Sequence, residues 1–481
     1  MKKTMFTMML LLAMGGSIVA QTFQSETFFH QEPEQKLNLN TLKLNSMPAE
    51  SRQVMASGEN ETEVNVKWID RIFNLPDYMR TFYQTYGEKV QEVLNGGSNW
   101  LSDPTLGTYN ASSNNYQVAM KTFEGNISFN YPEGASGDVI RECAANAVNE
   151  ACSSRNTELN TFMTFLCLSL NYDYPEAFWA NSYYAWSSNW SYTFSYSHTG
   201  TTGQINYTQN MLFTLKSNDF DHRRTEFQSP QVLSQAVDEY NNRVNSILSN
   251  CPTSNLPYYK ISYLNDWLTK HNSYNSIVGN GGEASTIAWS AMSALRGTTG
   301  NIGPVCEGYA RAFKILCDKL NIPCVLAVGF ASSTPNSTAE SHMWNEVKME
   351  DGKWYAVDVT WNDPFDKQNR PVSGYETTKW LLLGSDDIVS TNFTFAESHP
   401  FSITWDVDPN KESQWNYQLA SFITNHHYNV PSAISNMPTT NVNANNHMYT
   451  LDGKHLGSGT YMPARHGRKQ LIIRGDKIIL W

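Results

Sequence analysis

The spacing of hydrophobic residues predicts both helices and strands along the 481-residue chain. Between Trp68 and Leu94 apolar residues recur every three or four positions, which predicts helical structure interrupted at Pro76. Elsewhere, alternation of apolar and polar residues predicts strands at 127–131, 192–196 and 209–215. Helical spacing predicts helices at 138–153, 162–170 and 230–248. In the last of these, the residues expected to face inward are Val232, Val237, Tyr240, Val244 and Ile247.

The pattern is clearest in the middle of the chain. A loop rich in Gly and Pro ends at Cys306, which opens an apolar helical repeat, and residues 321–323 (Asn-Ile-Pro) end that helix. Three strands are expected after it. They cover residues 324–330, 342–348 and 354–361, joined by a polar loop at 331–341 and a turn at 351–352.

These elements predict an α+β fold with several parts. The parts are a signal peptide (1–20), a linker or pro-segment without periodicity (21–60), an N-terminal α+β region (61–257), a core (258–410), a second linker (411–446) and a small C-terminal β-meander (447–481).

The first twenty residues predict export. Lys2 and Lys3 precede a short apolar run that ends in small residues, as in a secretory signal peptide. The run is short for a membrane span, and no other stretch is apolar enough to be one. We therefore expect a periplasmic, cell-surface or extracellular protein. A buried N-terminal helix is the alternative interpretation.

The charge argues against two classes of partner. The formal net charge is −11, and loss of Lys2 and Lys3 with a signal peptide makes it −13. Such a surplus of acidic groups disfavours nucleic acid and anionic membrane surfaces as partners. The seven cysteines are too few for a disulfide scaffold, and their odd number leaves at least one thiol outside intramolecular pairs.

An aromatic cluster after residue 177 has two interpretations. It is either a stacking platform for a sugar or peptide, or core packing, which we favour. Its members are Phe178, Trp179, Tyr183, Tyr184, Trp186 and Trp190.

Cys306 is a candidate nucleophile because of where it lies. The amide groups at a helix N-terminus favour a thiolate, which is the form of cysteine that attacks carbonyl carbons. Taken alone, a cysteine in this position is more often a structural residue.

His342 and Asp358 lie on the two arms of one predicted hairpin, so the length of the connection decides whether they meet. A two-residue turn at 351–352 would place them on opposite faces of the sheet. An odd-length connection, such as residues 349–353, pairs Asp358 with Trp344 and makes His342 its diagonal neighbour on the same face. A Cys306–His342–Asp358 triad therefore requires the longer connection, in which Asp358 fixes the imidazole and His342 polarises Cys306.

These residues carry a family resemblance. Residues 306–310 (CEGYA), 342–347 (HMWNEV), 351–355 (DGKWY) and 357–361 (VDVTW) resemble, in order and spacing, motifs of the transglutaminase-like superfamily in its secreted bacterial branch. The resemblance covers about residues 258–365. Residues 263–268 resemble the preceding helix of that core, and residues 174–179 resemble a segment often found before it.

The resemblance implies a papain-like α+β core, in which a nucleophile helix packs on an antiparallel sheet that carries His342 and Asp358. It also implies a cysteine peptidase or acyltransferase that acts through a thioester on peptide or protein amides. Papain-like enzymes often place a Gln in the oxyanion hole, but no Gln lies between Gly281 and Val305. The amide of Cys306 supplies one expected donor, and the second is not identified.

Several alternatives remain at this point. The rival function is a non-catalytic surface-binding or assembly protein that uses the same fold. We expect no cofactor or metal, because the sequence around His342, His426 and His427 lacks zinc-site spacing. Trp344, Trp354 and Trp361 are interpreted as core residues rather than substrate contacts. The C-terminal module is either an export signal or a stabilising appendage.

Overall fold

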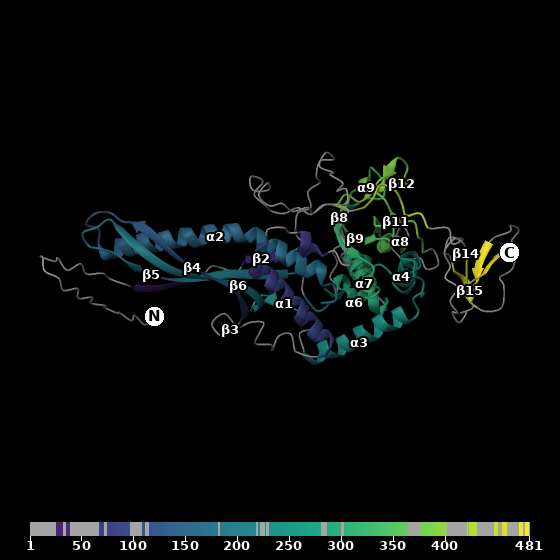
Figure 1. Cartoon of the computed structure of the whole chain (residues 1–481), viewed down its shortest axis with the longest axis horizontal. Coiled ribbons are helices and arrows are strands. Elements are labelled where there is room, and N and C mark those ends of the chain that lie inside the picture. The colour runs from purple at the N-terminus through teal and green to yellow at the C-terminus, as the bar shows by residue number, and fades with distance from the viewer. Residues whose placement is uncertain are drawn as a thin grey trace. The chain divides into compact units, whose positions relative to one another are not determined.

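A computed structural model of the chain contains two compact units (Figure 1). Of the described residues, those from 26 to 241 form the first unit and those from 242 to 480 form the second. Among the residues described below, no helix combines the length and the hydropathy that crossing a membrane requires. The structure describes residues 26–31, 35–38, 67–71, 75–96, 108–110, 115–180, 183–217, 220–221, 227, 230–279, 286–299, 303–363, 376–401, 421, 423–430, 447–450, 455–458, 471–474 and 477–480.

The first unit is built on a seven-stranded antiparallel sheet. Its long strands β5 (Tyr183–Ser195), β6 (Thr202–Ser217) and β4 (Asn115–Asn130) are neighbours in that order. Short strands add to them: β3 (Thr108–Asn110) pairs with β4, and β7 (Phe220–Asp221) pairs with β6.

Two further strands lie where we expected a linker or pro-segment. Strands β1 (Glu26–Gln31) and β2 (Gln35–Asn38) pair with successive parts of β5. The prediction that residues 21–60 lack regular structure is therefore wrong at these strands. The edge of β5 provides their backbone hydrogen bonds, a long-range effect that the local hydrophobic pattern does not contain.

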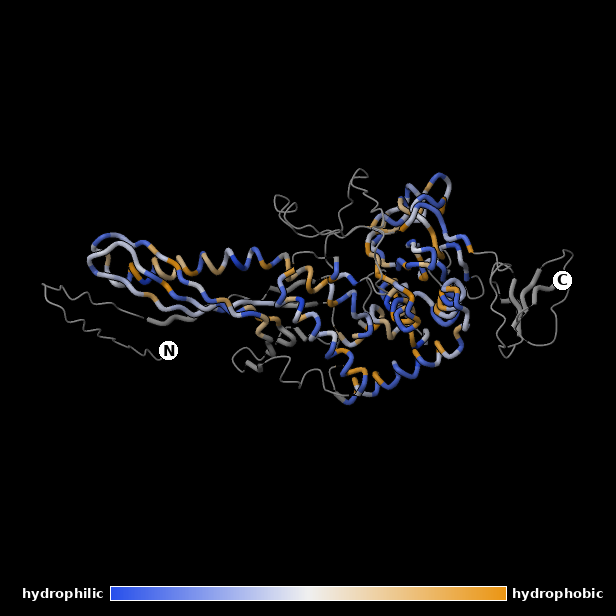
Figure 2. The backbone as a smooth tube through the Cα atoms, viewed as in Figure 1, coloured by the Kyte–Doolittle hydropathy of each residue, from blue (hydrophilic) through white to orange (hydrophobic). Residues whose placement is uncertain are grey.

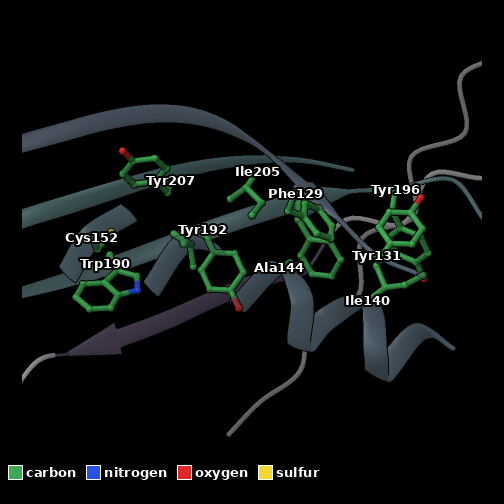
Figure 3. Packing of buried hydrophobic residues seen from close by; sticks show 12 residues of the cluster. Phe129, Tyr131, Ile140, Ala144, Cys152, Trp190, Tyr192, Tyr196, Ile205 and Tyr207 are labelled. Atoms are coloured by element: carbon green, nitrogen blue, oxygen red, sulfur yellow. The ribbon is translucent and has the colours of Figure 1, made fainter. Parts of the chain in front are cut away.

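One long helix covers one face of the sheet. In α2 (Gly137–Asp173), Ile140, Ala144, Val148 and Cys152 recur every fourth residue and are buried, so they form a single stripe. Figure 3 shows this stripe packed against aromatic residues of the strands. Between Thr122 and Asn130 of β4 the residues on the other face are polar and exposed, which gives colour changes along the strands in Figure 2. The two helices predicted at 138–153 and 162–170 are one helix, because no Gly or Pro separates them.

The helical prediction for residues 68–94 is confirmed, including its interruption. A 3-10 turn, η3 (Trp68–Arg71), is followed by α1 (Asp77–Leu94). Asp173, at the end of α2, accepts hydrogen bonds from the amides of Trp68 and Ile69 at 2.7 and 3.0 Å. This buried carboxylate therefore joins η3 to α2.

The aromatic cluster is core. Phe178, Trp179, Trp186 and Trp190 are each at most 2% exposed, as the packing interpretation requires. The side chains of Tyr183 and Tyr184 lie outside the described part of the chain.

Helix α3 (Pro230–Ser249) agrees with its prediction except at one position. Val232 is exposed and Leu233 is buried, because the helical repeat runs back from Val237 by four residues.

The second unit has a four-stranded antiparallel sheet at its centre. The order is β11-β10-β9-β8, with β8 (Cys324–Ala331), β9 (Glu340–Lys348), β10 (Trp354–Val357) and β11 (Leu381–Leu383). Strand β10 is shorter than the predicted 354–361, because Asp358 caps the short helix α8 (Val359–Asn362) and turns the chain out of the sheet.

Helices and a hairpin complete this unit. The helices are α4 (Pro257–His271), α5 (Ser276–Gly279), η6 (Thr286–Trp289), α6 (Ala291–Arg296), α7 (Cys306–Lys319) and α9 (Phe395–Ser398), and the hairpin is β12 (Ile388–Ser390) with β13 (Phe393–Thr394).

The expected linker at 411–446 is ordered in part. Ile423 forms a parallel bridge with Trp354, and the amide of Tyr428 donates to the carbonyl oxygen of Leu382 at 3.0 Å. Tyr428 is also buried. Residues 423–430 thus belong to the edge of this sheet, contrary to the linker prediction, while residues 431–446 lie outside the described part of the chain.

The C-terminal residues form a separate small antiparallel sheet. Its order is β15-β14-β16-β17, with β14 (His447–Thr450), β15 (His455–Ser458), β16 (Leu471–Arg474) and β17 (Lys477–Leu480). Strands β14, β16 and β17 are antiparallel neighbours in chain order, as the predicted meander requires, and β15 adds to the other edge of β14.

Candidate active site

Cys306 is the first residue of α7, as its sequence predicts. The preceding residue, Val305, provides no side-chain cap, so the amides of the first turn are directed towards Cys306 without a competing acceptor from a capping side chain. The thiol is half-buried, whereas Cys317 and Cys324 are buried. Among the cysteines of this unit, Cys306 therefore combines a helix N-terminus with partial exposure.

Close packing explains why the motif that begins at Cys306 has a glycine at position 308. A β-carbon at Gly308 would lie 2.6 Å from the carbonyl oxygen of Ala288 and 2.7 Å from Oγ of Ser293. The first turn of α7 therefore packs directly on the backbone of η6 and on a serine side chain of α6. The amide of Val305 donates to the carbonyl oxygen of Ala288 at 3.1 Å, which fixes the chain just before Cys306.

The connection between β9 and β10 has the odd length that a triad requires. Trp354 pairs with Lys348 and Val357 pairs with Asn345, leaving residues 349–353 as a five-residue connection. The amide of Met349 donates to the carbonyl oxygen of Lys353, and Gly352 adopts a φ of 78° inside the turn. His342 and Asp358 consequently lie on one face of the sheet, and this geometric prediction is confirmed.

His342 and Asp358 are joined by a short hydrogen bond. Nε2 of His342 lies 2.7 Å from Oδ2 of Asp358, and both side chains are buried. Oδ1 of Asp358 accepts from the amide of Trp361 at 3.0 Å. Burial alone would raise the pKa of Asp358, but the charge of His342 and hydrogen bonds from two histidines hold that pKa well below its usual range.

Cys306 contacts the same imidazole. Burial by itself lowers the pKa of His342, but the Asp358 carboxylate and a hydrogen bond with Cys306 outweigh it and raise that pKa to about 10. At neutral pH the ring therefore carries a proton on each nitrogen. Since Nε2 faces Asp358, Nδ1 is the nitrogen available to Cys306.

A second histidine binds Asp358, and sequence reasoning missed it. Nε2 of His399 lies 3.0 Å from Oδ2 of Asp358 and its side chain is fully buried. The segment that carries His399 pairs with β8 next to Gly329, where a β-carbon would lie 2.1 Å from the carbonyl oxygen of Pro400. Gly329 pairs with His342 in the sheet and with Phe401 in an isolated bridge. The absence of a side chain at Gly329 is the signal in the sequence that could have indicated that another segment packs closely on β8 there.

Aromatic rings surround the two histidines. Trp344 and Trp354 are buried and Trp361 is half-buried, which agrees with their interpretation as core residues around the hairpin. The His342 ring lies 5.6 Å from Trp361, and the His399 ring lies 4.6 Å from it. These rings keep water away from the Asp358 carboxylate, which is 0% exposed.

His342, Asp358 and His399 have the composition of a metal site but not its spacing. Their nearest ligand atoms all lie within 4.8 Å of one another. A tetrahedral zinc ion holds its ligand atoms roughly 3.3 Å apart, since its bonds are about 2.0–2.2 Å long. The 2.7 Å separation between His342 and Asp358 is shorter and matches a hydrogen bond. These residues therefore do not fit a bound metal.

Two tyrosines lie near the start of α7. Tyr274 packs beside Val305, and the pKa of its hydroxyl is raised by burial and then by negative charge at Cys306, Glu340 and Asp358. Tyr309, on α7, donates a hydrogen bond to the buried carboxyl of Asp363. Tyr274 is thus a neutral hydroxyl close to Cys306.

Comparison with known proteins identifies this region. Residues 245–359 match the sequence model of the transglutaminase-like superfamily, and that segment contains Cys306, His342 and Asp358. This segment of the chain is therefore similar to that superfamily. The matched segment begins within α3 and includes the start of the core that we predicted at residue 258.

Similarities over the whole chain are weak. A solved structure described as a TGase is 15% identical with a TM-score of 0.26, over 44% of this chain and 55% of its own. The chain thus spans about half the length of that protein. A candidate cysteine protease from Cytophaga hutchinsonii is 14% identical with a TM-score of 0.20, over 53% of this chain and 69% of its own. No protein among the curated sequences matches the chain.

The structure brings together all three residues of the predicted site, from α7, β9 and the end of β10. It adds His399 from outside the matched segment and Tyr274 from inside it. His426 and His427 lie elsewhere, and Nδ1 of His427 contacts Asp387 at 3.0 Å.

Proposed function

We propose that this chain is an exported, cysteine-dependent amide hydrolase or acyltransferase acting on peptide or protein substrates. The observation that carries the proposal is the position of His342, which contacts Cys306 at the start of α7 and Asp358 at 2.7 Å. A protonated imidazole beside the thiol stabilises a thiolate, and the helix N-terminus acts in the same direction. Export rests on residues 1–20, which lie outside the described part of the chain.

The first half of the reaction forms a thioester. The Cys306 thiolate attacks the carbonyl carbon of an amide, a C–S bond forms and the carbonyl electron pair moves to oxygen. As the C–N bond breaks, His342 transfers its proton to the leaving nitrogen. The amine departs and the acyl group remains on Cys306.

The second half releases the acyl group. Neutral His342 takes a proton from water or from an amine, which attacks the thioester, and Cys306 leaves as a thiolate. Asp358 keeps the imidazole oriented in both halves. Transfer to water gives hydrolysis, which we favour because no described feature of the site selects an amine.

The developing oxyanion requires donors. The amide of Cys306 is one, and we assign the hydroxyl of Tyr274 as the second. Tyr274 packs beside Val305, and negative charge at Cys306 raises the pKa of its hydroxyl, so the two groups are close. It takes the role that a Gln side chain plays in papain-like proteins.

Thiol labelling tests the nucleophile without a known substrate. Cys306 should react with iodoacetamide near neutral pH much faster than the other six cysteines. Cys251 is the internal control, since it is also half-buried but burial raises its pKa to about 11. Wild-type protein, Cys306→Ala and Cys251→Ala are labelled in parallel and mapped by mass spectrometry. Equal labelling of Cys306 and Cys251 would contradict the proposal and favour a non-catalytic binding protein.

A substrate screen follows. Wild-type and Cys306→Ala proteins are incubated with a peptide library, with and without a labelled primary amine. Cleavage by the wild type alone identifies a hydrolase, and incorporation of the amine identifies a transferase. Cell fractionation tests export, since recovery of the intact N-terminus in the cytoplasm would contradict that part of the proposal.

A further inference from the structure

Asp358 holds two imidazoles rather than one. Its Oδ2 atom accepts from Nε2 of His342 at 2.7 Å and lies 3.0 Å from Nε2 of His399. Its Oδ1 atom accepts from the amide of Trp361. Three N–H groups from three segments of the chain therefore surround one carboxylate that has no contact with water.

His399 is fixed and cannot reach a substrate. Its ring stacks on Phe395, with centroids 4.5 Å apart and planes at 9°, and its amide donates to the carbonyl oxygen of Phe395 at 2.7 Å. Its side chain is fully buried, beyond the ring of Trp361. Any effect of His399 on Cys306 must therefore pass through Asp358.

The partners of His399 define its tautomer. Because Asp358 is ionised, Nε2 of His399 must carry the proton that it shares with Oδ2. Burial lowers the pKa of His399 despite the nearby carboxylate, which favours the neutral ring with its hydrogen on Nε2. Oγ of Ser398 lies 3.1 Å from Nδ1, and it donates its own hydrogen to the carbonyl oxygen of Ser332 at 2.7 Å.

We propose that His399 is a positioning residue, which donates its Nε2 hydrogen to Asp358 and holds that carboxylate aimed at His342. This inference rests on the proposed function. With Oδ1 bonded to Trp361 and Oδ2 shared between two imidazoles, rotation of the carboxylate would break buried hydrogen bonds. The donor from His399 therefore restricts Asp358 to the orientation in which it stabilises the His342 imidazolium and, through it, the Cys306 thiolate.

Two substitutions separate the hydrogen bond from the packing. His399→Phe keeps an aromatic ring against Phe395 but has no donor, and His399→Gln keeps an N–H at a similar reach. The readout is the rate at which iodoacetamide alkylates Cys306 in the full-length protein from about pH 5 to about pH 9. We expect His399→Phe to slow alkylation about tenfold near pH 6, and His399→Gln to slow it by less than about threefold.

The Asp358→Asn background provides the matched control. Without a carboxylate to position, His399→Phe should change alkylation of Cys306 by less than about twofold, so the two effects are strongly non-additive. A structural role alone would give equal losses in both backgrounds, together with a lower melting temperature, and would overturn the inference. So would an unchanged rate in the single His399→Phe variant when wild-type Cys306 is selectively reactive.

The wild-type protein provides a second measurement if a variant does not fold. Nitrogen-15 NMR of the histidine rings should show His399 neutral with its hydrogen on Nε2 near pH 7. A hydrogen on Nδ1 alone, or a charged ring, contradicts the assignment. Failure of the proposed function is recognised separately, because wild-type Cys306 would then be no more reactive than Cys251.

Discussion

Asp363 should make the stability of the core depend on pH in a defined window. It follows α8, is 5% exposed, and accepts a hydrogen bond from Tyr309 on α7. Burial raises the pKa of its carboxyl to about 7; the Tyr309 hydrogen bond opposes this increase and the charge of Glu376 adds to it. Asp363→Asn keeps the shape and an acceptor for Tyr309 but removes the titration.

The sign and size follow from linkage. A carboxyl whose pKa is higher in the folded state binds its proton more tightly there, so the fold loses stability as pH rises from about 4 to about 7. Above this range the loss is constant. With an ordinary value of 3.8 and a folded value of about 7, the charged carboxylate lowers the free energy of unfolding by roughly 2–4 kcal/mol, the larger figure being an upper limit.

Thermal unfolding at two pH values tests this. For a domain of this size each kcal/mol shifts Tm by about 2–4 °C, so Asp363→Asn should melt at least about 4 °C above the wild type near pH 8.5 and level with it at about pH 3, below the ordinary pKa of the carboxyl. The exposed Asp386→Asn is the control and should follow the wild type at both pH values. A variant no more stable than the wild type near pH 8.5 would refute the reasoning. Titration of His342 does not affect the difference in Tm, since His342 is present in both proteins.

Three other predictions follow from the site. Asp358→Asn should leave the protein folded by circular dichroism but lower turnover of a peptide found by screening about 10³- to 10⁴-fold, because Asn can select the wrong imidazole tautomer; unchanged turnover would limit Asp358 to a structural role. Tyr274→Phe should lower turnover roughly 100-fold without slowing alkylation of Cys306, since alkylation forms no oxyanion; equal loss in both assays would contradict its assignment as a donor. Gly308→Ala should lower Tm by roughly 5 °C because its new methyl group meets the backbone of Ala288, while Gly137→Ala, which has space, should have little effect.

Local patterns predicted the elements that carry Cys306, His342 and Asp358. The apolar repeat after Cys306 marks helix α7, and the period of two along β9 and β10 decides which faces His342 and Asp358 occupy. The sequence was compatible with two turn lengths at 349–353. Only the register of Trp354 with Lys348 distinguishes them, and that register depends on the packing of both strands.

The features that the sequence did not predict all depend on contacts between residues far apart in the chain. His399 reaches Asp358 only because its segment pairs with β8 at Gly329. Strands β1 and β2 form because β5 has an edge to pair with, and residues 423–430 are ordered because they add to the edge near Trp354. Such pairings connect positions far apart in the chain, so periodicity within a short window cannot report them.

The pairing of β8 with Phe401 at Gly329 also sets limits for recombinant fragments. A protein ending at residue 359, where the family match stops, would retain Cys306, His342 and Asp358. It would lack His399 and strand β11, and the Asp358 carboxylate would lose a buried hydrogen-bond donor. The smallest fragment suited to testing the proposed activity therefore runs from within α3 through residue 430, so that the residues bridging to Gly329 and Trp354 are expressed together with Cys306.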